Sequence, residues 1–114
     1  MSGISTHVLD TSRGKPAAEV PVHLEREEAP EKWKRVGEGR TDANGRCAPL
    51  VNGGAALAAG NYRLVFDTKT YFAAQKVDGL YPLVQVQFTV RAGEEHFHIP
   101  LLLSPNGYTT YRGS

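Results

Sequence analysis

Strict two-residue alternation of apolar and polar side chains marks several stretches of this chain. Between Leu83 and Val90, for example, every second side chain is apolar and the side chains between them are polar. Because successive side chains of a β-strand point to opposite sides, such stretches predict strands with one buried face. The predicted inward faces are Val20, Val22 and Leu24; Tyr62, Leu64 and Phe66; and Val84, Val86, Phe88 and Val90.

Turn-forming pairs separate these stretches at short intervals, which is the rhythm of a β-sandwich. Only the segment from Thr68 to Val77 breaks the alternation, and its composition suits a short helix that stops at Asp78-Gly79. We therefore predict an all-β fold with one helix. The turn signals are Arg13-Gly14, Asn44-Gly45, Asn52-Gly53-Gly54, Gly60-Asn61, Asp78-Gly79, Ala92-Gly93 and Asn106-Gly107.

The stretch from His96 to Ser104 differs from the others because both of its faces carry apolar groups. Phe97, Ile99, Leu101 and Leu103 share one face, and His96, His98, Pro100 and Leu102 share the other. A strand with an apolar outer face usually meets another layer. In a chain of this length, that layer is predicted to be a second subunit.

Length and composition place the chain among ordinary globular proteins. Its 114 residues suit one domain spanning residues 1–114, and 40% hydrophobic with 22% charged residues is far from the signature of disorder. The formal charge is +1 and the basic residues are scattered, so nucleic acid is not an expected partner. The single cysteine, Cys47, has no partner for an internal disulfide or a CxxC site.

No stretch of the chain is long and apolar enough to predict a membrane span. The segment from Met1 to Leu9 also lacks the basic and apolar regions of a secretory leader. We therefore expect no membrane association and a cytoplasmic location.

Two of the four histidines interrupt the strand pattern. His23 alternates with Val22 and Leu24, so we expect it to face solvent without a special role. His7 and His98 instead lie among aliphatic neighbours, where an apolar side chain would pack better. Each is either a hydrogen-bonded structural histidine or a functional one, and the pattern leaves both interpretations open.

Metal binding is the minority interpretation of these histidines. His96 and His98 form a His-x-His pair on one strand face, a spacing that could hold zinc if His7 supplied a third ligand. The segment containing Asp42, Asn44 and Gly45 resembles a calcium loop only superficially, because its glycine comes too early and no glutamate follows at the twelfth position. We interpret that segment as a turn and predict no bound metal.

Two further features could contribute to a binding site. Arg46 follows the Asn44-Gly45 turn, and its planar guanidinium could hydrogen-bond a flat, carbonyl-rich molecule, although ordinary solvation is the commoner role for such an arginine. The segment from Tyr108 to Ser114 has the pattern of a strand that runs to the last residue. Most chain termini fray, so an aromatic-rich terminus indicates that this end of the chain packs against the rest of the molecule.

These segments together resemble the transthyretin-related 5-hydroxyisourate hydrolase family over nearly the whole chain. The terminal Tyr-Arg-Gly-Ser is the most specific signal, because hormone-carrying transthyretins lack it. The matching segments are His7-Val8-Leu9-Asp10-Thr11, Pro16-Ala17, Thr41-Asp42, Asn44-Gly45-Arg46, the run from His96 to Pro105, and Tyr111-Arg112-Gly113-Ser114.

The resemblance implies a transthyretin-like β-sandwich of two four-stranded sheets with one short helix, assembled as a homotetramer, a dimer of dimers with a central channel. It implies hydrolysis of the cyclic amide of 5-hydroxyisourate, a small-molecule substrate of urate breakdown, with no cofactor. Carried over to this sequence, it makes His7, Arg46, His98 and Ser114 catalytic. It also assigns substrate binding to His7, Arg46, Tyr111, Arg112 and Gly113.

Ring opening by water needs a base, a donor for the oxyanion and an acid for the leaving nitrogen. One of His7 and His98 is the expected base, and the sequence leaves open which. Two other classes of function stay open. A carrier would favour an apolar lining over these polar side chains, and an interaction module would show no turnover.

Overall fold

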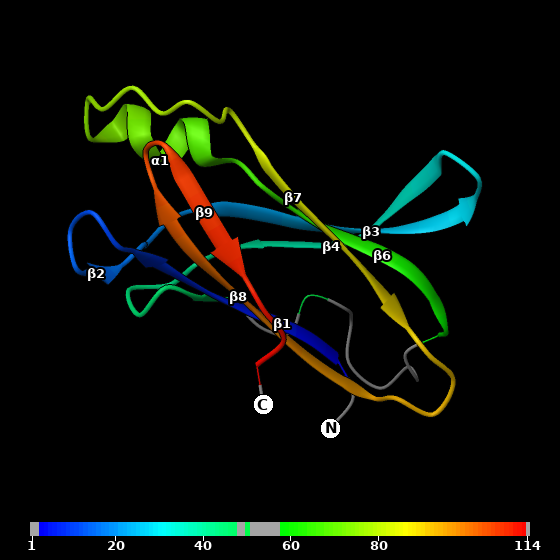
Figure 1. Cartoon of the computed structure of the whole chain (residues 1–114). Coiled ribbons are helices and arrows are strands. Elements are labelled where there is room, and N and C mark those ends of the chain that lie inside the picture. The colour runs from blue at the N-terminus through cyan, green and yellow to red at the C-terminus, as the bar shows by residue number, and fades with distance from the viewer. Residues whose placement is uncertain (1–2, 48–49, 51–57, 114) are drawn as a thin grey trace.

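Two β-sheets packed face to face form the molecule, with one short helix at their edge (Figure 1). The structure is a computed structural model, and it describes residues 3–47, 50 and 58–113. The elements within these residues are β1 (Gly3–Asp10), β2 (Lys15–Pro16), β3 (Pro21–Ala29), β4 (Lys32–Arg40), β5 (Arg46–Cys47), β6 (Gly60–Phe66), α1 (Thr68–Ala74), β7 (Val84–Val90), β8 (His96–Ser104) and β9 (Gly107–Thr110).

The sandwich predicted from the sequence is confirmed, with one difference in the number of strands. One sheet has the order β4-β3-β6-β7, as four strands. The other has the order β2-β1-β8-β9, and the two-residue strand β5 adds a fifth member by pairing with β1. The strand β5 arises because the chain leaving the turn at Asn44-Gly45 runs along β1 beside His7.

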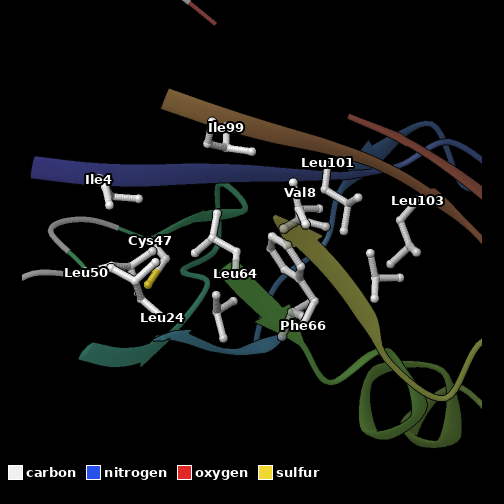
Figure 2. Close-up of a cluster of buried hydrophobic side chains, with 14 of the residues drawn as sticks. Ile4, Val8, Leu24, Cys47, Leu50, Leu64, Phe66, Ile99, Leu101 and Leu103 are labelled. Atoms are coloured by element: carbon white, nitrogen blue, oxygen red, sulfur yellow. The ribbon is translucent and has the colours of Figure 1, made fainter. Parts of the chain in front are cut away.

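The predicted inward faces meet in a single core between the sheets (Figure 2). Alternation therefore identified most of the buried positions of β3, β6, β7 and β8, because one side of each strand faces the other sheet. Two positions differ, since Phe88 is only half-buried and Pro100, assigned to the outer face, is buried. The residues that meet across the core in Figure 2 include Ile4, Val8, Ile99, Leu101 and Leu103 from β1 and β8, and Leu24, Leu64 and Phe66 from β3 and β6.

The helix α1 lies inside the segment predicted to be helical, but it ends at Ala74, before the predicted end. Its first turn is capped by Asp67, whose carboxylate accepts from the Thr70 N–H at 3.0 Å. Tyr71 and Phe72 form its buried face, and the Tyr71 hydroxyl donates to the Asp10 carboxylate at 2.7 Å. The helix is thereby tied to the end of β1.

The predicted terminal strand is shorter than expected. The ladder between β8 and β9 ends at the pair Leu101 and Thr110, and it resumes in the same register only at an isolated bridge between His98 and Gly113. Pro100 has no N–H to donate at the intervening pair, and its carbonyl accepts from the Thr110 hydroxyl at 2.7 Å. The proline therefore interrupts the ladder.

No helix in the described part of the chain has the length and apolar character that crossing a bilayer requires.

Candidate active site

Three of the side chains singled out in the sequence lie on one outer face of the β2-β1-β8-β9 sheet. His7 of β1 is directly opposite Arg46 of β5 on one side, and on the other side β1 runs parallel to β8, which carries His98 (Figure 1). Their chain neighbours point into the core, so alternation directs His7, Arg46 and His98 outward. The inward neighbours are Thr6, Cys47 and Ile99.

A tight turn positions both Arg46 and the ring of His7. The Asp42 carboxylate accepts from the N–H groups of Asn44 at 2.9 Å and Arg46 at 3.0 Å, and these bonds lower the pKa of Asp42. Gly45 adopts φ +77, and a Cβ there would lie 2.3 Å from the Val8 carbonyl oxygen. The turn thus packs directly on β1. It is the turn predicted from the Asn44-Gly45 pair.

The same turn orients His7. Its Nε2 donates to the Asn44 carbonyl oxygen at 2.9 Å. A carbonyl can only accept, so Nε2 of His7 carries a proton, and in the neutral form of the ring Nδ1 is the nitrogen that holds the lone pair. His7 is half-buried on this face.

His98 is held by a residue that the sequence analysis missed. Ser5 of β1 is opposite His98 in the parallel register, and its Oγ lies 2.8 Å from Nδ1 of the ring. Burial lowers the pKa of His98, and the nearby charges of His7 and Arg46 lower it further. The ring is therefore neutral at neutral pH. The available signal for Ser5 was its position two residues before His7, on the same strand face.

The carboxy-terminal tail reaches the same ring. Gly113 donates its N–H to the His98 carbonyl at 2.7 Å, and a Cβ on Gly113 would lie only 2.7 Å from Cδ2 of the imidazole. The structure thus brings Gly113 together with His7, Arg46 and His98. Ser114 lies outside the described residues.

The two preceding tail residues are placed differently. Tyr111 is 54% exposed. The guanidinium of Arg112 lies 4.2 Å from the centre of the Phe97 ring and 3.2 Å from the Glu94 carboxylate, and it also donates to the His96 carbonyl. These contacts anchor the tail to the turn between β7 and β8. The binding roles of Tyr111 and Arg112 stay predictions.

The remaining histidines differ in their surroundings. His96 is exposed on β8, and among the described residues no group of three His, Cys, Asp or Glu side chains is arranged to hold a metal ion. His23 is on the other sheet, half-buried rather than fully solvent-facing, with its Nε2 3.3 Å from the Glu25 carboxylate. It lines a cavity of about 750 Å³ that includes none of the site residues named above. The residues singled out from the sequence therefore lie away from this cavity, on the face where His7 pairs with Arg46 and β1 pairs with β8.

The fold and the site define the class of protein: a transthyretin-like sandwich with titratable side chains on an outer sheet face. Comparison with known proteins supports this class. A solved structure of Klebsiella pneumoniae 5-hydroxyisourate hydrolase superposes with a TM-score of 0.86 at 40% identity, covering 100% of both chains. Sea bream transthyretin in complex with thyroxine superposes with a TM-score of 0.88 at 32% identity, covering 96% of this chain and 93% of that one. The 5-hydroxyisourate hydrolase of Mus musculus is 43% identical over 114 residues, covering 99% of this chain and 96% of the relative.

The model of the HIUase/Transthyretin family matches residues 4–113. The chain belongs to this family.

Proposed function

We propose that this protein is a 5-hydroxyisourate hydrolase, which opens the six-membered ring of 5-hydroxyisourate to give 2-oxo-4-hydroxy-4-carboxy-5-ureidoimidazoline. The observation that carries the proposal is similarity along nearly the full length of relatives with that name, including the mouse and Klebsiella proteins. The site supports it, because His7, Arg46 and His98 share one polar face with the end of the tail. We treat residues 1–114 as one hydrolase domain.

The reaction adds water to a ring carbonyl and breaks the carbon–nitrogen bond of a cyclic amide. His98 is the proposed base, because its lowered pKa leaves the ring neutral and able to take a proton from water. As the carbonyl carbon becomes tetrahedral, Arg46 stabilises the negative charge on its oxygen. The proton on His98 then passes to the leaving ring nitrogen, so the enzyme returns to its starting state.

His7 and the tail have binding roles in this proposal. His7 is held by its bond to Asn44 beside Arg46, which leaves Nδ1 as the ring nitrogen that can accept a hydrogen bond from an N–H or O–H group of the substrate. The family resemblance assigns substrate binding to Tyr111, Arg112 and Gly113; Gly113 lies against His98, whereas Arg112 would have to leave Glu94 and Phe97 to reach a substrate. The same resemblance makes Ser114 the group that orients the base or the water. The set is polar, which suits a small heterocycle rich in carbonyl and N–H groups.

The test is direct. Urate oxidase generates 5-hydroxyisourate in solution, and its decay is followed by ultraviolet absorbance with and without the purified protein. We expect clear acceleration over spontaneous decay. His98→Asn and Arg46→Ala should each lower kcat/KM by roughly a hundredfold to ten-thousandfold, because each removes a proton acceptor or a charge-stabilising donor. His23→Asn, which changes a histidine of the other sheet, is the matched control and should retain the rate. Decay no faster than in buffer would refute the proposal.

A carrier function is the second candidate, because the sea bream transthyretin that superposes on this chain was solved with thyroxine. The site disfavours it, since three titratable side chains converge where a hydrophobic hormone would need apolar contacts. Thyroxine binding measured by calorimetry, with no acceleration of 5-hydroxyisourate decay, would favour the carrier function instead.

The assembly follows from the same face. Leu102 lies beside His98 and Pro100 on the outer side of β8 and is only half-buried in the single chain. We propose that this face packs against a second dimer in a homotetramer and that the site opens onto the channel between them. A complex with the mass of four chains in native mass spectrometry would support this assembly, and a monomer would refute it.

We also propose a cytoplasmic location, which cell fractionation tests.

A further inference from the structure

The ring of His98 is constrained on two sides by residues of different segments. Ser5 Oγ lies 2.8 Å from Nδ1, and the backbone of Gly113 packs against Cδ2 on the opposite side of the ring. Both contacts are made on the outer face of the sheet, and Ser5 and His98 are each half-buried. The ring edge that carries Cε1 and Nε2 is therefore the edge left for a substrate.

A hydroxyl group beside Nδ1 determines which nitrogen of a neutral imidazole carries the proton. In a neutral ring one nitrogen donates and the other accepts, and the hydrogen bond made by one nitrogen sets the state of the other. If Nδ1–H donates to Ser5, then Nε2 keeps its lone pair. When Nε2 takes a proton, the resulting imidazolium still donates from Nδ1, so Ser5 accepts in both states.

We propose that Ser5 is a positioning residue of the hydrolase: its Oγ accepts from Nδ1–H of His98 and reserves the Nε2 lone pair for the attacking water. This inference rests on the proposed function. In the step, the water proton moves to Nε2, the water oxygen forms its bond to the ring carbonyl carbon, and the carbonyl electron pair moves onto oxygen. The proton on Nε2 later moves to the amide nitrogen as the carbon–nitrogen bond breaks. Ser5 itself exchanges no proton with the substrate.

The pairing of Ser5 with His98 predicts a specific pattern of kinetic effects. Ser5→Ala removes the acceptor without adding volume, so the ring can rotate or adopt the other tautomer. We expect kcat to fall roughly tenfold to a hundredfold, the range of a lost hydrogen bond to a group that becomes charged. KM should change by less than about threefold, because Ser5 does not touch the substrate. Ser5→Thr keeps the hydroxyl and should restore most of kcat.

Ser104→Ala is the matched control, because Ser104 is also half-buried in this sheet but bonds the Gly107 carbonyl in the turn between β8 and β9. It should leave kcat within about twofold of the parent, as expected for a neutral hydroxyl away from the reacting groups. A loss of kcat equal to that of Ser5→Ala would show a general packing effect and overturn the proposal.

The tautomer can be read without turnover. In protein labelled with ¹⁵N at histidine, the His98 signals, assigned by their loss in His98→Asn, should show a protonated Nδ1 and an unprotonated Nε2. Ser5→Ala should shift this pattern toward the Nε2–H form, and Ser5→Thr should not. If His98 of the parent protein is already in the Nε2–H form, the proposal is overturned. It is also overturned if the Ser5→Ala variant has an unchanged His98 tautomer and an unchanged kcat. This measurement needs no substrate, so it tests the role of Ser5 independently of the hydrolase function. If the hydrolase function itself is wrong, the parent protein will not accelerate the decay of 5-hydroxyisourate.

Discussion

One added methyl group at Gly113 should damage catalysis more than stability. The Cβ of Gly113→Ala would lie 2.7 Å from Cδ2 of His98 and 3.3 Å from the His98 carbonyl oxygen. Ordinary van der Waals contact begins near 3.4 Å, so the tail and the ring must separate by about 0.7 Å. Gly113 does not adopt a positive φ, so the alanine backbone itself is not strained. The cost therefore arises from the contact with His98.

The expected loss of activity follows from how precisely a catalytic base must be placed. A misplacement of about 1 Å can cost roughly a hundredfold in rate, so we expect kcat/KM to fall by roughly tenfold to a hundredfold. Overpacking inside a core costs about 1–3 kcal/mol, but the tail is joined to β8 here by an isolated bridge and can lift away. The free energy of unfolding should therefore fall by less than about 1 kcal/mol.

Initial rates on freshly generated 5-hydroxyisourate, together with urea denaturation, test this expectation. Gly107→Ala is the matched control, because the nearest atom to its Cβ would be the Ser104 hydroxyl oxygen at 3.8 Å. It should retain the parent rate. A Gly113→Ala variant as active as the parent, or a Gly107→Ala variant as impaired as Gly113→Ala, would refute the idea that the tail positions the His98 ring.

Three further predictions concern pH and the supports of the site. Burial, and then the nearby His7, Arg46 and His96, lower the pKa of His98 from its ordinary value of 6.5. The acid-side inflection of kcat/KM should therefore lie below pH 6.5, and an inflection above that pH would contradict a low-pKa base. Burial alone would raise the pKa of Asp10, but hydrogen bonds led by those from Ser12 and Tyr71 hold it below its ordinary value. The Asp10 carboxylate therefore binds a proton more readily in the unfolded chain than in the folded one. Asp10 thus stabilises the fold at neutral pH, and this contribution is lost as the pH falls through and below about 3.9. Asp10→Asn should lower the free energy of unfolding by about 1–3 kcal/mol at pH 7 in urea denaturation and flatten its acid dependence, and unchanged stability would contradict this role. Glu94→Gln removes a solvent-screened ion pair with Arg112, so kcat/KM should fall by no more than about fivefold and the difference should shrink at high salt. A hundredfold loss would mean that Glu94 acts more directly.

The alternating pattern in the sequence identified β3, β6, β7 and β8, but it gave no prediction for β4 or for the two-residue strands β2 and β5. Val84, Val86 and Val90 are buried as predicted, because a strand packed on one side needs an apolar side chain at every second position. The turn at Asn44-Gly45 was also identified correctly, because Gly45 needs a positive φ that few other residues adopt. Pro100 also carried local information, since a missing N–H interrupts any ladder that reaches it.

Alternation by itself does not specify which strands become neighbours. The parallel pairing of β1 with β8 joins residues 93 positions apart, and only that pairing places Ser5 against His98. Likewise, the direction of Arg112 depends on Glu94 and Phe97, which reach it only when the tail lies across β8. The sequence by itself thus determined which faces of β3, β6 and β7 point inward, because that depends on local periodicity. It also singled out His7, Arg46 and His98 as candidates, and the family resemblance supplied their expected roles. The tertiary structure alone decided how those side chains are held, because hydrogen bonds between distant segments form only once the strands are paired.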